Sequence, residues 1–97
     1  MILPFLFIAP SGNRGRGVFT SKKIPIGTDI EISPVLEFSV KDRKQLEGTL
    51  LYNYIFEWGN SRKKGALGMG YISMYNHSYS ANCGYEMDFD NNIMTIR

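Results

Sequence analysis

Hydrophobic and polar residues alternate over short stretches of this chain, and glycine or proline separates most stretches from the next. The pattern predicts short β-strands joined by tight turns. It is clearest near the end, where apolar and acidic residues alternate over 85–89, a polar turn follows at 90–92, and 93–96 returns as the second strand of a hairpin. Further strands are expected at Phe5–Ala9 and Gly17–Thr20, and a turn at Ile24–Thr28.

The middle of the chain predicts one strand and one helix. Thr28–Phe38 alternates in part, and we expect a strand there that Pro34 interrupts. Ser39 then supplies a helix cap, with Asp42 three residues later, as in a capping box. Apolar residues recur at helical spacing as far as Tyr54, so a single helix is expected over this segment.

Gly48 weakens that helix by about 1 kcal/mol relative to alanine. The stretch 54–58 is rich in residues that favour strands. Three glycines between 65 and 70 predict a small-residue, flexible segment whose backbone closely approaches another segment or a ligand. A short helical turn is expected at 71–75. The fold class is therefore mainly β with little helix.

Composition narrows the class of protein. The 97 residues fit a single domain, 1–97, and 43% apolar with 21% charged residues is ordinary for a globular protein. A net charge of +2 is too small to predict nucleic acid as a partner. Cys83, the one cysteine, can form neither an internal disulfide nor a zinc cluster, so we expect an intracellular protein without metal. The apolar start, residues 1–9, is too short for a membrane span and is expected to form a strand.

Two motifs hold candidate chemistry. Gly15, Arg16 and Gly17 form a glycine turn that can present backbone groups to a ligand, although a plain turn entering a strand is the alternative. Asn76 and His77, within Tyr-Asn-His-Ser, can bind a polar ligand through their donors and acceptors, or can be a buried histidine near a turn. A single histidine argues against a metal site, and no nucleophile-elbow pattern supports a hydrolase.

A third motif, Asn-Cys-Gly-Tyr, lies just before the hairpin. Cys83 has no basic residue near it in sequence to lower its pKa, so we expect a small buried side chain, not a nucleophile.

The order of these motifs resembles the SET domain family over about residues 9–97. The resemblance rests on the glycine turn, the Ile-Pro-Ile-Gly turn at 24–27, Asn-His-Ser at 76–78, and the asparagine and tyrosine of 82–85. The residues Phe-Glu-Trp-Gly at 56–59 are similar to those of the short single-domain members. The resemblance implies a mainly β, SET-domain (β-clip) fold of small curved sheets with one short helix.

The resemblance also implies the chemistry. Family members transfer a methyl group from S-adenosylmethionine to a lysine ε-amine of a protein or peptide. By position, Gly15, Arg16 and Gly17 meet the cofactor largely through backbone atoms, and Asn76 and His77 bind its amino-acid or adenine portions.

Tyr85 matches a tyrosine that lines the lysine channel in some members, and is the candidate catalytic residue. No metal and no membrane partner are expected. The expected location is the cytoplasm, or the nucleus in a eukaryote.

The sequence also departs from the family pattern. Members often continue after the last hairpin with an acidic stretch and a catalytic tyrosine, which form a threaded pseudoknot strand, whereas this sequence ends at Arg97. We therefore expect a domain incomplete at its C-terminal end. Tyr79 stands where zinc-bearing members have a cysteine. The alternative function is a non-catalytic SET-fold interaction module that forms homo-oligomers through its open edge; a further alternative is a β-rich binding domain without a cofactor.

Overall fold

A computed structural model of the chain describes residues 1–12, 15–75 and 83–97. The elements in this part of the chain are β1 (Leu6–Pro10), β2 (Arg16–Thr20), β3 (Glu31–Phe38), α1 (Val40–Gln45), η2 (Leu50–Tyr54), β4 (Ile55–Trp58), β5 (Lys64–Gly68), η3 (Ile72–Met74), β6 (Tyr85–Asp88) and β7 (Ile93–Ile96). The elements η2 and η3 are 3₁₀ helices. The predicted fold class, mainly β with one short α-helix, is confirmed.

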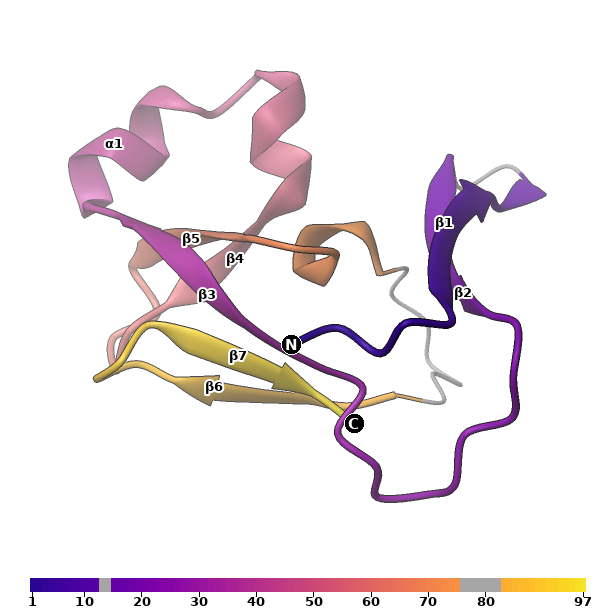
Figure 1. The fold of residues 1–97 in the computed structure, drawn as a ribbon. Coiled ribbons are helices and arrows are strands. Elements are labelled where there is room, and N and C mark those ends of the chain that lie inside the picture. The colour runs from indigo at the N-terminus through magenta and orange to yellow at the C-terminus, as the bar shows by residue number, and fades with distance from the viewer. Residues whose placement is uncertain (13–14, 76–82) are drawn as a thin grey trace.

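The strands form two antiparallel sheets. β1 pairs with β2, and a larger sheet has the order β4-β5-β3-β7-β6. Figure 1 shows the β1–β2 pair set apart from the larger sheet, with the single turn of η3 on the side of the sheet that faces the pair. The expected hairpin is confirmed as β6 and β7, paired from Tyr85 with Ile96 to Asp88 with Ile93.

The central strand, β3, runs through Pro34 without interruption, so the predicted break is wrong. Residues 31–34 pair with β7, and residues 35–38 pair with β5 on the other side. Pro34 has no N–H to donate, but its carbonyl accepts a hydrogen bond of 3.0 Å from the backbone of Met69. The proline therefore occupies the point where the strand changes partner, and the strand continues.

The polar face of β3 points into the protein. Glu31 and Ser33 are buried, whereas Ile32 and Leu36 are exposed. The alternation in the sequence predicted the strand, but the usual rule that apolar residues face the core would place these side chains the other way round. Glu31 and Ser33 therefore need partners for their polar atoms inside the protein.

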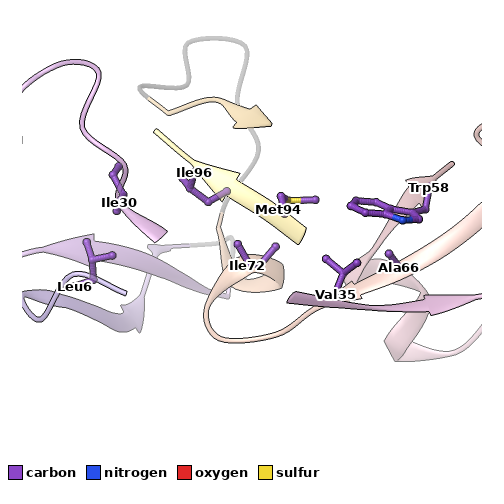
Figure 2. Packing of buried hydrophobic residues seen from close by; sticks show 8 residues of the cluster. All are labelled: Leu6, Ile30, Val35, Trp58, Ala66, Ile72, Met94 and Ile96. Atoms are coloured by element: carbon purple, nitrogen blue, oxygen red, sulfur yellow. The ribbon is translucent and has the colours of Figure 1, made fainter. Parts of the chain in front are cut away.

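The core is formed where both sheets and η3 meet. Figure 2 shows Ile72 of η3 beneath Met94 and Ile96 of β7, with Trp58 farther along the same layer. The buried hydrophobic residues are Leu6, Ile30, Val35, Trp58, Ala66, Ile72, Met94 and Ile96. Burying one Leu, Ile, Val or Met side chain contributes about 1.5–3 kcal/mol to the free energy of unfolding, so each of these residues matters to the stability of a small domain.

The predicted single helix from Ser39 to Tyr54 is wrong in its length. Ser39 does cap α1, because its hydroxyl oxygen accepts a hydrogen bond of 3.1 Å from the backbone N–H of Asp42. The helix ends at Gln45, however, and Gly48 follows with a φ of 81°. That left-handed glycine ends the helical path, and the apolar residues beyond it form η2 instead.

The small residues predicted as a flexible segment form β5, so that prediction is wrong. The expected close approach of their backbone is confirmed. A Cβ at Gly65 would lie 3.3 Å from the side chains of Arg43 and Ile55, and a Cβ at Gly68 would lie 2.2 Å from Ile72. β5 thus packs η3 directly against its backbone.

Candidate active site

The glycine turn leads into the first residues of β2. The backbone N–H of Ser11 donates a hydrogen bond of 2.6 Å to the carbonyl of Gly15, which has a φ of 71°. A Cβ at Gly15 would meet no atom of residues 1–12, 15–75 and 83–97 within 4 Å. Arg16 is exposed and Gly17 is buried, where it pairs with Ala9 of β1. Among the described residues, the backbone at Gly15 is therefore open on the side where a side chain would stand.

β2 lies in contact with η3, the 3₁₀ turn that leads to Tyr75. Tyr75 is the last described residue before the motif Asn-His-Ser. Asn76 and His77 themselves lie outside the described residues. The fold thus brings the strand that follows the glycine turn beside the segment that leads into the second motif, although Arg16 and Tyr75 are 59 positions apart in the sequence.

The side chain of Glu31 holds residues 71–75, which lead into the second motif, by hydrogen bonds. Its Oε1 accepts a hydrogen bond of 2.9 Å from the Tyr75 hydroxyl, and its Oε2 accepts bonds from the Tyr71 backbone N–H at 2.9 Å and the Ser33 hydroxyl at 2.7 Å. Burial, followed by the nearby Glu31 charge, raises the pKa of Tyr75 far above its ordinary value. Tyr75 therefore stays neutral, and its hydroxyl donates a hydrogen bond to the carboxylate.

Tyr85, the candidate catalytic residue, begins β6. Its ring meets that of Phe56 edge to face, with 5.6 Å between the ring centres. Burial raises the pKa of Tyr85, and Cys83 adds to the effect. The phenol is accordingly neutral at physiological pH, in surroundings that are partly apolar.

Cys83 lies partly buried beside the two tyrosines. Burial raises the pKa of its thiol, which makes it a poor nucleophile. The prediction of a small buried side chain is confirmed only in part, because Cys83 packs against the core but is half-buried. Tyr75, Cys83 and Tyr85 all pack against the hydrophobic core.

Sequence reasoning missed Glu31 and Tyr75. The sequence showed Glu31 only as a polar position in an alternating strand, and nothing local indicated that it would be buried. The one signal was Gly70: a Cβ there would lie 2.3 Å from the Glu31 carboxylate. That glycine was predicted to mark a close approach, but not to which residue.

Residues 1–12, 15–75 and 83–97 contain no group of three or more His, Cys, Asp and Glu side chains placed to hold a metal ion. None of the helices formed by these residues is long and apolar enough to cross a membrane.

Comparison with known proteins adds a family and two relatives. The model of the SET domain matches residues 15–97. A histone-lysine N-methyltransferase of Schizosaccharomyces pombe, named as specific for lysine 37 of histone H3, is 40% identical over 91 residues, which are 93% of this chain and 60% of that protein. The chain thus spans less than two thirds of the length of this relative.

A crystal structure from Plasmodium falciparum, described as a histone methyltransferase, superimposes with a TM-score of 0.66. The match has 26% sequence identity and covers 94% of this chain and 77% of the other. The overall fold described above is therefore shared with a second protein.

Proposed function

The chain belongs to the SET domain family and has its fold, and on that premise we propose that it transfers a methyl group from S-adenosylmethionine to the ε-amine of a protein lysine. The relatives are named as histone methyltransferases, which favours transfer over a non-catalytic interaction module. The observation that carries the proposal is the contact between β2 and η3, because it places the glycine turn beside the segment that leads into Asn-His-Ser.

The described residues at the glycine turn fit a cofactor of this kind. Gly15 combines a left-handed backbone with open space where a side chain would stand, so its backbone groups are accessible to a ligand. We infer that Gly15, Arg16 and Gly17 hold the cofactor with Asn76 and His77. When bound, it supplies a methyl group made electrophilic by a sulfonium.

Tyr85 and Phe56 are proposed to receive the lysine. A free lysine has a pKa of about 10.4, so its amine is charged and unreactive at neutral pH. Partly apolar aromatic surroundings disfavour the charged form. The neutral hydroxyl of Tyr85 can hold the uncharged amine by a hydrogen bond, and positioning of this kind supplies much of the rate in bimolecular transfer.

The substrate is proposed to be a protein with an accessible lysine. Histone H3 is the first acceptor to test, since the Schizosaccharomyces pombe relative is named for a lysine of that protein.

The test is methyl transfer to histone H3 from isotopically labelled S-adenosylmethionine, read by mass spectrometry, in two matched variants. Gly15→Ala and Gly27→Ala each place a side chain at a left-handed, open position, with φ values of 71° and 81°. Both variants should lose similar stability, but only Gly15→Ala should lose transfer. Equal transfer by the two variants would contradict the proposed cofactor site.

A further inference from the structure

The buried carboxylate of Glu31 has no part in the transfer proposed above. It is fully buried on β3, and hydrogen bonds reach both of its oxygens. A carboxylate is costly to bury unless its oxygens accept hydrogen bonds. An apolar side chain at this position of the core would avoid that cost, so the carboxylate is better explained by what its hydrogen bonds hold in place.

Two of those hydrogen bonds hold the segment of residues 71–75, one at each of its ends. Tyr71 donates its backbone N–H to one oxygen, and Tyr75 donates its hydroxyl to the other, each at 2.9 Å. Between them lies η3, whose Ile72 is buried in the core. One side chain of β3 therefore fixes both the start and the end of residues 71–75.

The third bond differs, because it stays within β3. Ser33 donates its hydroxyl to Glu31 at 2.7 Å from two residues along the same strand. It satisfies the carboxylate without connecting β3 to another element. The backbone of Gly70 completes the packing, since a Cβ there would lie 2.3 Å from Glu31 Oε2 and 2.8 Å from Ser33 Oγ.

Tyr75 connects this anchor to the lysine side of the candidate site. Tyr75, Cys83 and Tyr85 all pack against the same hydrophobic core, and Tyr85 lies against Phe56. We propose that Glu31 is a positioning residue for methyl transfer, which holds Tyr75 beside Tyr85 and so fixes the geometry in which the lysine amine is received. This inference rests on the proposed function.

The first experiment compares variants that break hydrogen bonds between Glu31 and residues 71–75 with one variant that keeps them. Tyr75→Phe removes only the bond to Oε1, and Glu31→Gln keeps the size of the side chain but replaces one acceptor with a donor. Because misplacement by about 1 Å can cost a hundredfold in rate, kcat should fall about tenfold to a hundredfold in both variants. Binding of S-adenosylhomocysteine, for which no contact with Tyr75 is proposed, should change much less than kcat.

Ser33→Ala is the matched control. It also removes a hydrogen bond to Glu31, and should lower thermal stability, but it leaves Tyr71 and Tyr75 attached. Its kcat should stay close to that of the unaltered protein. If Ser33→Ala and Tyr75→Phe lose kcat equally at a temperature where both are folded, the carboxylate is merely structural and the inference is wrong.

A second readout does not depend on methyl transfer. Cys83 is the one cysteine in the sequence, so its rate of reaction with a thiol reagent at fixed pH reports on its neighbourhood alone. Release of Tyr75 should expose the thiol and speed the reaction in Tyr75→Phe and Glu31→Gln, but not in Ser33→Ala. An unchanged rate in folded Tyr75→Phe overturns the inference, even where Glu31→Gln fails to fold. Absence of transfer by the unaltered protein would instead contradict the proposed function, and Cys83 reactivity would still decide the role of Glu31.

Discussion

The indole nitrogen of Trp58 donates a hydrogen bond of 2.9 Å to the side-chain oxygen of Asn92. Trp58 is fully buried at the end of β4, and Asn92 lies in the turn between β6 and β7 with a φ of 53°. The bond joins two ends of the larger sheet that are 34 residues apart in sequence. The ring of Trp58 also meets Phe89 edge to face. The hairpin that carries Tyr85 is therefore tied to the strand that carries Phe56.

Loss of this bond should destabilise the protein. Asn92→Gly keeps the left-handed backbone but leaves the buried indole N–H without its partner, at a cost of about 1–3 kcal/mol in the free energy of unfolding. Asn92→Ala should cost about 1–2 kcal/mol more, because alanine is strained at this φ. Urea denaturation measures both. Asn91→Ala is the control: it removes only the exposed side-chain hydrogen bond to Asp88, and a loss as large as that of Asn92→Gly would contradict the role given to Trp58.

Gly68 should tolerate no side chain. A Cβ there would lie 2.2 Å from Ile72, which is buried in the core, and a shift of Ile72 would disturb η3. Overpacking of this kind typically costs about 1–3 kcal/mol, so Gly68→Ala should lower the melting temperature clearly. Gly84→Ala meets no atom within 4 Å and should have little effect. Equal melting temperatures for the two variants would show that η3 does not pack on β5 as described.

Stability should fall at alkaline pH. Burial raises the pKa of Cys83 above the ordinary thiol value of 9.0, so the folded protein keeps a proton that the unfolded chain has lost. Stability from this group is complete below pH 9.0 and is lost as the pH rises from there through the folded pKa. Tyr85 acts in the same direction above pH 10.0.

Urea unfolding as a function of pH measures this loss. Cys83→Ala removes the thiol, so its stability should decline less steeply above pH 9.0 than that of the unaltered protein. Parallel declines in the two proteins would show that the thiol is not protected by the fold.

Local patterns in the sequence predicted the local parts of the fold. The hairpin of β6 and β7 follows from alternation on both sides of a polar turn, and the cap at Ser39 follows from one side chain and a backbone N–H three residues away. The length of the helix could not be predicted in this way. Leu50 and Tyr54 keep helical spacing beyond Gly48, and the left-handed backbone at that glycine decides against it.

The candidate site also has a part that local sequence patterns predict and a part that they do not. The glycine turn was recognised because its residues are adjacent in sequence. The bond between Glu31 and Tyr75 joins residues 44 positions apart, so no local pattern could reveal it. The alternation in β3 was equally ambiguous, because period two fixes which residues share a face but not which face is buried. In the structure the face that carries Glu31 is buried, because Glu31 has hydrogen-bond partners inside the protein.

The central claim is that this chain binds S-adenosylmethionine through the glycine turn and the Asn-His-Ser motif. Isothermal titration with S-adenosylhomocysteine tests it most directly, on the unaltered protein, on Asn76→Ala, and on Asn60→Ala as a matched control in the exposed turn after β4. The prediction is saturable binding that is kept in Asn60→Ala and lost in Asn76→Ala while the protein stays folded. Absence of binding by the folded, unaltered protein, or equal binding by Asn76→Ala, would contradict the claim.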